Sequence, residues 1–373
     1  MTPDLVVVGA GLSGAVIAER AARELSWRVL VIERRGHVAG NAFDYLDQHG
    51  VRVHRYGPHV FHTNSEKVWS YLTRFTQWRR YQHRVRAVVE GRLVPLPFNL
   101  NSLARVFPST RARSMRQALL RQYGLGASLP ILRLRDSPDY AVRVLAGYVY
   151  EQVYLGYTMK QWGLRPEDLD ASVTGRVPVR ISHDDRYFTD RFQGVPRHGY
   201  SAMVRRMLDH PNIQVLLDTD FHDVEQSVRY RCLVYTGPID RFFDYRHGEL
   251  PYRSLRFESR HSPRQRIQRS GAITYPRQHE YTRTCEFKVL TGQRVAGTTI
   301  SFEYPQSHTP GRTTPYYPMP LPESRARYQL YANDAARLHN VLFCGRLGSY
   351  QYLNMDQAVA QALKTFDRLR AQH

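Results

Sequence analysis

The stretch Val6-Val7-Val8-Gly9-Ala10-Gly11-Leu12-Ser13-Gly14 decides the fold of this chain. The apolar residues 5–8 predict a short buried strand, and residues 15–22 predict a helix directly after three glycines in G-x-G-x-x-G spacing. In this motif the first glycine allows a tight turn, the second lets the backbone approach a pyrophosphate, and the third lets helix and strand pack closely. The free N–H groups and positive dipole end of the helix favour phosphate binding.

An acidic residue follows the second predicted strand, at residues 29–32. Glu33, about 20 positions after the glycines, can bind the ribose hydroxyls of an adenosine dinucleotide. It disfavours NADP, although Arg34 and Arg35 follow it, and the motif alone leaves NAD and FAD open. A late strand at 341–344, then a loop and a helix over 355–369, returns the chain toward the glycines. This arrangement suits a flavin, because a helix N-terminus can face an anionic isoalloxazine.

Length and composition indicate a multidomain globular protein. The 373 residues suggest two or three domains, and 42% hydrophobic residues suffice for their cores. The sequence has no run of about 18 apolar residues and no basic-then-apolar leader, so we expect neither a membrane span nor a secretory signal. Cys232, Cys285 and Cys344 lack metal-ligand spacing and are expected to be buried thiols in a reducing cytoplasm.

The formal net charge of +20 raises the possibility of a nucleic-acid partner. The arginines, however, are spread along the whole chain, and an anionic substrate would also need them, so we expect no nucleic acid. His59 and His62 have spacing compatible with metal binding, but no third ligand set is evident, and we expect no metal.

The remaining pattern predicts a helical block and a second sheet. Ser65 is expected to cap a helix over 66–75, a hairpin is expected at 84–97, and residues 102–165 are expected to be helical without strands. A helix is also expected over 323–338. Late strand-like runs, which predict an antiparallel sheet, lie at 255–258, 272–275, 285–290 and 298–304.

Taken together, several motifs resemble the UDP-galactopyranose mutase family of flavin-dependent UDP-sugar pyranose/furanose mutases. The resemblance covers almost the whole chain, and the later motifs are the specific ones. Its carriers are 6–14, 57–63, 157–163, 192–194, 235–240, 252–257 and 345–353.

The resemblance implies an α/β fold with a Rossmann-like FAD-binding domain, a helical insertion domain and an antiparallel β-sheet domain. The FAD-binding domain is expected at 1–80, 195–245 and 335–373, and the helical substrate domain at 100–170. The sheet domain is expected at 81–99, 171–194 and 246–334. The resemblance also implies a homodimer or larger homo-oligomer, and the cysteine usage described above favours a cytoplasmic location. It implies that reduced FAD interconverts UDP-galactopyranose and UDP-galactofuranose through a flavin N5–sugar adduct, without net redox.

The same resemblance assigns site residues. Arg176 and Arg283 correspond to the arginines that hold the diphosphate, and His59 to a residue beside the isoalloxazine. The residues implied for the substrate are Tyr157, Thr158, Trp162, Tyr187, Arg253, Tyr317, Arg346, Tyr352 and Asn354. Those implied for FAD are Gly9, Gly11, Leu12, Ser13, Gly14, Glu33, Arg34, Gly40, Asn41, His59, Gly237, Gly345, Arg346 and Met355.

Three positions depart from the family pattern. Asn354 stands where an acidic residue is usual, Phe287 where a histidine is frequent, and His83 where an asparagine is frequent. None of the three is an arginine implied to hold the diphosphate. The resemblance therefore defines the type of reaction better than the identity of the sugar. The alternatives are the same chemistry on a related UDP-sugar, or a flavin amine oxidase-like oxidoreductase.

Overall fold

A five-stranded parallel sheet forms around the glycine motif in the computed structural model, which describes residues 2–319 and 321–372. Its strand order is β12 (Ile213–Leu216), β2 (Val29–Ile32), β1 (Leu5–Val8), β13 (Cys232–Tyr235) and β19 (Val341–Phe343). Each neighbouring pair is parallel. The carboxyl ends of all five strands therefore lie at one edge, where the glycine turn follows β1. The strands predicted at 5–8 and 29–32 are confirmed.

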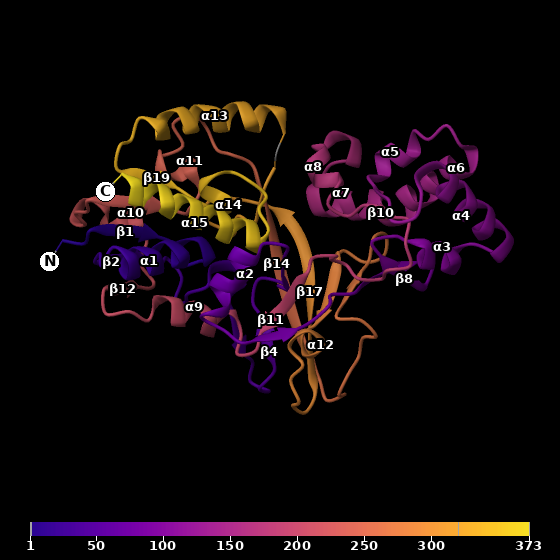
Figure 1. Cartoon of the computed structure of the whole chain (residues 1–373), viewed down its shortest axis with the longest axis horizontal. Helices are drawn as coiled ribbons and strands as arrows, with labels where there is room; N and C mark the ends of the chain where they lie inside the picture. Colours follow the sequence, from indigo (N-terminus) through magenta and orange to yellow (C-terminus); the bar gives the residue numbers. More distant parts are fainter. Residues whose placement is uncertain (1, 320, 373) are drawn as a thin grey trace.

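Helices cover both faces of this sheet, as Figure 1 shows. The first face packs against α1 (Leu12–Glu24), α2 (Glu66–Thr73), α9 (Tyr200–Leu208) and α15 (Met355–Ala371). The second face packs against α10 (Phe221–Val224) and α11 (Ile239–Phe242), next to α13 (Pro322–Ala336). Ser65 caps α2 as predicted, because its hydroxyl accepts a hydrogen bond from the Val68 N–H at 3.3 Å.

A seven-stranded sheet lies in the middle of the molecule. Its order is β18 (Tyr317–Pro318), β14 (Tyr252–Ser262), β17 (Thr298–Ser307), β16 (Arg283–Glu286), β15 (Ala272–Thr274), β7 (Val85–Val89) and β8 (Arg92–Leu96). The hairpin of β7 and β8 is confirmed, but β15 pairs with β7 in parallel, so the sheet is mixed and not purely antiparallel. A long crossover separates these two strands in sequence, so no tight turn forces them to be antiparallel.

The strand expected at 285–290 is wrong in its second half. The strand β16 ends at Glu286, and a short helix, α12 (Phe287–Thr291), follows it. Phe287 and Leu290 are both fully buried three positions apart, which is the spacing of a helix and not of a strand. Gly292, at φ +68°, ends the helix in the left-handed conformation.

A block of helices projects from the other side of this sheet. It comprises α3 (Leu100–Val106), α4 (Ser109–Tyr123), α5 (Ile131–Arg135), α6 (Tyr140–Val149), α7 (Gly156–Trp162) and α8 (Ala171–Thr174). A π-helical segment, Tyr150–Leu155, joins α6 to α7. The expectation of no strands here is wrong, because β9 (Ser128–Leu129) pairs with β10 (Val179–Arg180) after the chain returns. Sequence periodicity cannot reveal a two-residue strand whose partner lies so far along the chain.

Shorter elements complete the chain. A three-stranded sheet has the order β5 (Phe61–Thr63), β11 (Phe192–Pro196) and β6 (Trp78–Arg80), and β3 (Asp44–Leu46) pairs with β4 (Arg52–His54). The short helices are η1 (Gly40–Ala42), η3 (Pro166–Asp168), η4 (Glu225–Ser227) and α14 (Gly345–Gly348).

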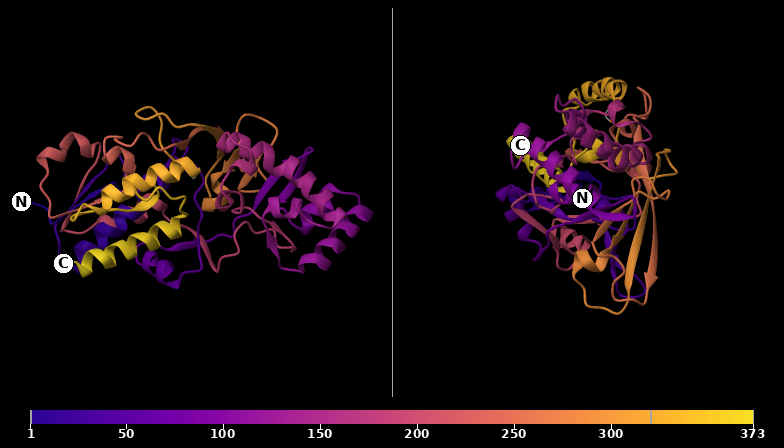
Figure 2. Two further views of the ribbon diagram at one scale, coloured as in Figure 1. Left: turned by 90° about the horizontal axis from the view of Figure 1, so that it is seen from above. Right: turned by 90° about the vertical axis from the view of Figure 1, so that its right-hand side faces the viewer.

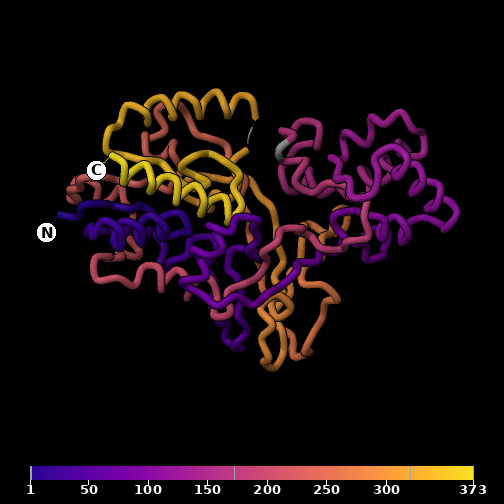
Figure 3. Tube along the Cα trace, in the orientation of Figure 1, coloured from indigo at the N-terminus to yellow at the C-terminus, as the bar shows by residue number. Residues whose placement is uncertain are grey.

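The parallel sheet, the mixed sheet and the helical block follow one another along the longest axis (Figure 2). The trace in Figure 3 shows both chain ends on the side of the parallel sheet. Cys232, Cys285 and Cys344 are buried and form no disulfide, as expected. Within the described ranges, no helix combines the length and apolar character that a membrane span requires.

Gly14 supports a prediction about stability. A Cβ at this position would lie 1.9 Å from the Gly9 carbonyl oxygen, so Gly14→Ala forces α1 away from the glycine turn. We expect the free energy of unfolding to fall by about 1–3 kcal/mol, as overpacking does elsewhere. Gly147→Ala is the matched control, because this α6 residue has open space around it and should be neutral or stabilising. Denaturant titrations measure both effects; equal stability of the two variants would contradict the packing argument.

Candidate functional site

The glycine turn shapes the wall of a first cavity. Gly9 has φ +101°, and a Cβ there would lie 2.2 Å from the Thr236 hydroxyl. That hydroxyl donates a hydrogen bond to the Val8 carbonyl at 2.7 Å, which joins the ends of β1 and β13. Gly11 is the N-cap residue of α1, and because glycine has no side chain it cannot cap the N–H groups of the first turn. These groups are therefore open to an anionic ligand.

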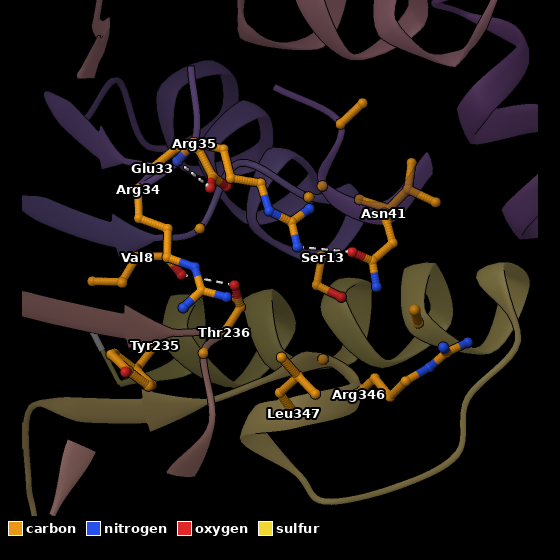
Figure 4. A pocket seen from close by; sticks show the side chains of 18 of the residues that line it. Val8, Ser13, Glu33, Arg34, Arg35, Asn41, Tyr235, Thr236, Arg346 and Leu347 are labelled. Atoms are coloured by element: carbon orange, nitrogen blue, oxygen red, sulfur yellow. Dashed lines mark hydrogen bonds between the residues drawn. The ribbon is translucent and has the colours of Figure 1, made fainter. Parts of the chain in front are cut away.

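Glu33 follows the end of β2 and lines the same cavity. Its carboxylate is 6% exposed and accepts hydrogen bonds from the backbone N–H of Ala10 at 2.9 Å and of Arg35 at 3.0 Å. Figure 4 shows Glu33 and Arg34 toward one end of the cavity and Arg346 toward the other. The carboxylate thus joins the end of β2 to the glycine turn while it lines the cavity.

Nearly all residues expected to bind FAD line this first cavity. They are Gly9, Gly11, Leu12, Ser13, Glu33, Arg34, Gly40, Asn41, His59, Gly237, Gly345, Arg346 and Met355. Gly14 does not line it and instead brings α1 close to the turn. An uncapped helix N-terminus after a glycine turn, with a buried acid at the next strand end, fits a dinucleotide: pyrophosphate at the helix and ribose at Glu33.

A second cavity, of about 560 Å³, lies between the parallel sheet, the mixed sheet and α7. It meets the first cavity at Asn41, His59, Arg346, Asn354 and Met355, which line both. Residues far apart in sequence converge here. The other expected residues that line it are Tyr157, Trp162, Arg176, Tyr187, Arg283, Tyr317 and Tyr352.

Two arginines of the second cavity are held by neutral groups. Arg176 donates hydrogen bonds to the Tyr352 carbonyl at 2.9 Å and to the Asn354 side chain, and its guanidinium lies 3.7 Å from the centre of the Tyr352 ring. Arg346 donates to the carbonyls of Tyr316 at 3.0 Å and Leu353 at 2.5 Å. Their charges are oriented but not neutralised, which suits an anionic ligand.

Arg283 is paired with a carboxylate that the sequence analysis missed. Its Nη2 lies 2.6 Å from Oε2 of Glu303, which is 2% exposed and lines the cavity from β17. Burial favours a neutral guanidinium, yet the Glu303 charge raises the pKa of Arg283 well above its usual value. The Nε of Arg283 has no partner within residues 2–319 and 321–372. Side chains alternate between the two faces of a strand, so Glu303 shares a face with buried Ser301. This pattern could have identified Glu303 from the sequence.

Two expected substrate residues do not line the second cavity. Thr158 lines a smaller apolar cavity that adjoins it and shares Tyr157, Trp162 and Arg283 with it. Arg253 lies behind α7, where it donates hydrogen bonds to the carbonyls of Gln161 at 2.8 Å and Lys160 at 3.2 Å. Its charge therefore stabilises the C-terminal end of α7.

Histidines lie beside the arginines. Burial lowers the pKa of His59 and of His83 to about 3, so both stay neutral at physiological pH. Nδ1 of His62 lies 2.9 Å from the Asp190 carboxylate. In the described part of the chain, no three histidine, cysteine or acidic side chains are grouped to hold a metal ion.

Comparisons with known proteins show the family to which the chain is similar. The sequence pattern described as UDP-galactopyranose mutase matches residues 152–352, and that of an NAD(P)-binding Rossmann-like domain matches residues 7–75. A probable UDP-galactopyranose mutase of Klebsiella pneumoniae is 36% identical over 98% of this chain and 94% of its own length. A dTDP-fucopyranose mutase of Escherichia coli is 33% identical over 96% of each chain.

Solved structures share the fold at low sequence identity. A reduced UDP-galactopyranose mutase superposes with a TM-score of 0.75 at 15% identity, covering all of this chain and 95% of the other. A putrescine oxidase variant superposes with a TM-score of 0.60 at 12% identity, covering all of this chain and 99% of the other. The match to an NAD(P)-binding Rossmann-like domain agrees with a dinucleotide in the first cavity.

The buried histidines predict acid sensitivity. Burial lowers the pKa of His54, His59 and His83 to about 3, whereas the unfolded chain protonates histidine near pH 6.5. Unfolding therefore takes up protons below that pH, and stability falls as pH decreases from 6.5 to 5, by about 1 kcal/mol per pH unit for each histidine. Denaturant titrations at stepped pH measure the slope.

Two variants isolate this effect. His83→Gln should remove about one third of the slope that the three histidines contribute. His339→Gln, at an exposed position, is the matched control for the substitution itself. An unaltered slope in His83→Gln would show that His83 is not held neutral in the folded protein.

Proposed function

The chain belongs to the UDP-galactopyranose mutase family of isomerases, and on this premise we propose that it interconverts UDP-galactopyranose and UDP-galactofuranose, with FAD in the first cavity. The observation that carries the proposal is the meeting of the two cavities. His59, Arg346 and Asn354 line both, so the inner end of a dinucleotide would face a ligand held by the arginines. Bound and reduced, FAD would supply nucleophilic N5 to the anomeric carbon, and turnover would consume no electrons.

We propose that Arg176 and Arg283, called the clamp arginines below, hold the diphosphate from two sides. Arg176 enters from the loop after α8, and Arg283 from the first residue of β16. Guanidinium groups suit this role because they stay charged and bind phosphate oxygens through a planar fork. The unpartnered Nε of Arg283 offers one further donor.

Tyrosine hydroxyls would complete the diphosphate site. Burial raises the pKa of Tyr187 and of Tyr317, so their hydroxyls keep their protons and act as donors. Tyr352 stacks on Arg176 and lies at 4.9 Å, ring centre to ring centre, from Tyr317. These contacts keep the donors in place, and a substrate held by them would have less water near its anomeric carbon.

The nucleoside would lie against α7. Tyr157 and Trp162 line both the second cavity and the apolar cavity beside it, which Thr158 also lines. An aromatic face can stack on a pyrimidine, and a threonine hydroxyl can bond to its edge. Arg253, behind the helix, would position these residues without touching the substrate.

A second candidate substrate is another nucleoside diphosphate sugar. The relative named dTDP-fucopyranose mutase favours it, and so does Asn354, which places a neutral amide beside the shared wall of the cavities. An amine oxidase reaction is disfavoured, because Arg176, Arg283 and Arg346 would repel a cationic amine.

Removal of either clamp arginine tests the proposal. Negative charge grows on the leaving UDP in the transition state, so Arg176→Ala and Arg283→Ala should lower kcat as well as weaken binding. We expect a loss of roughly 2–4 kcal/mol, or about 30- to 1,000-fold in kcat/KM. Lysine substitutions should recover only part of this loss. Chromatographic assay of UDP-galactofuranose conversion by the reduced enzyme measures it.

The control is Arg116→Ala, on the exposed face of α4, which should retain full activity. The flavin content of all variants should match that of the parent, because neither clamp arginine lines the first cavity. Near-parental kcat/KM in both clamp variants would refute the assignment of this cavity to the diphosphate.

A further inference from the structure

Lys160 binds one loop of the mixed sheet through backbone carbonyls. The residue lies on α7 and is partly buried. Its ammonium group donates hydrogen bonds to the carbonyls of Tyr275, Gln278 at 3.2 Å, His279 at 3.3 Å and Tyr281 at 3.4 Å. Burial lowers the pKa of Lys160 to about 8, so the group keeps its charge at pH 7. These hydrogen bonds are therefore charge-assisted, which makes them stronger than neutral ones.

The loop that Lys160 binds, residues 275–282, is compact and leads into the strand of Arg283. The Tyr275 N–H donates to the Thr282 carbonyl at 2.9 Å, which closes the loop at its base. The rings that pack on one another inside it are those of Tyr275, His279 and Tyr281. The Thr282 hydroxyl donates to Glu303 at 3.2 Å, and Arg283 follows directly as the first residue of β16. A tie to this loop is therefore a tie to the strand that carries Arg283.

The helix α7 and the strand β16 belong to different structural units. The residues proposed for the nucleoside, Tyr157 and Trp162, lie on α7, in the block of helices that projects from the mixed sheet (Figure 1). Arg283 is fixed within that sheet, because β16 pairs with both β15 and β17. Lys160 joins α7 to the sheet from the side of β15 and β16, whereas Arg253 joins it from β14.

A nucleoside diphosphate must contact both units at once. When the spacing of two subsites is preset, the joined ligand gains affinity over its separate parts, because the second part binds at little further entropic cost. We infer that Lys160 is a positioning residue that holds α7 at a fixed distance from Arg283, so that the nucleoside and the diphosphate of one ligand bind together; this inference rests on the proposed function. Lys160 is not among the described residues that line the second cavity, so it would act without touching the ligand.

Lys160→Met in the FAD-loaded enzyme tests the inference, because methionine fills similar space but cannot donate to the carbonyls. Dissociation constants for UDP, uridine and pyrophosphate are measured at pH 7 by ligand-observed NMR titration. The affinity for UDP should fall about 10-fold, since a small misplacement of one subsite has a large effect on a ligand that spans both. The affinities for uridine and pyrophosphate should stay at the parental values, because each contacts one unit. Lys160→Arg should restore part of the UDP affinity, since a guanidinium also donates several N–H groups.

Lys288→Met is the matched control. The Lys288 ammonium also donates to backbone carbonyls, those of Val295 and Gly297, both at 2.6 Å, and to the Gln265 side chain at 3.0 Å. It lies on α12, beyond the far end of β16, and these partners are not part of α7. Both variants remove a cation from a set of carbonyls, but only Lys160→Met should separate the affinity for UDP from the affinities for its parts.

Unchanged affinity for UDP in Lys160→Met would overturn the inference. A loss for uridine or for pyrophosphate as large as the loss for UDP would also overturn it, because it would mark damage to one subsite and not to their spacing. Lys160→Gln, which shortens the side chain and removes its charge, provides the same test if the methionine variant folds poorly. Failure of the parent enzyme to bind UDP would instead count against the proposed function itself.

Discussion

The approach of α1 to the glycine turn is the constraint on which the site depends. Gly14 lies against the Gly9 carbonyl with no room for a Cβ, which brings the open N-terminus of α1 to the edge of the parallel sheet. Small buried residues, including Ala15, Ala18 and Ala22, keep the whole helix close to its neighbours. The helix α15 packs against α1 in the same core, and its first residue, Met355, lines both cavities. The same core therefore holds both the glycine turn of the first cavity and the start of α15, where the two cavities meet.

Three arginines place positive charge in the second cavity, where partial burial makes a charge energetically unfavourable. Desolvation lowers the pKa of Arg346, and within residues 2–319 and 321–372 Arg283 alone of the three central arginines has a carboxylate partner, Glu303. Backbone carbonyls and the Asn354 amide orient the other two without neutralising them. A bound diphosphate would offset this cost, and its developing charge during bond cleavage would offset more. The same arrangement would favour an anionic nucleotide over a cationic amine.

Local signals in the sequence predicted much of this structure. The β1–α1–β2 unit, the Ser65 cap and the β7–β8 hairpin follow from turn chemistry and periodicity within a few residues. The parallel pairing of β7 with β15 and the pairing of β9 with β10 depend on contacts between distant segments, so a single sequence does not reveal them. The spacing of Phe287 and Leu290 indicates a helix after β16. The apolar residues in this stretch also fit a strand, which is why a strand was predicted.

The candidate site shows the same difference between local signals and contacts of distant segments. The residues of the glycine motif lie where the sequence predicts, because one continuous segment builds that wall. Arg253 does not line the cavity, and Glu303 and Gln161 do, because their positions depend on how α7 packs against the mixed sheet. A motif identifies which residues belong near a site, whereas packing decides which of them face the ligand.

We propose that this mutase needs reduced FAD yet transfers no net electrons to its substrate. The most direct measurement is anaerobic conversion of UDP-galactofuranose by oxidised and by dithionite-reduced enzyme, with the flavin spectrum followed throughout. We expect product only with the reduced enzyme, over many turnovers, and a spectrum that remains that of reduced flavin. Equal turnover by the oxidised enzyme, or stoichiometric flavin reoxidation, would contradict it.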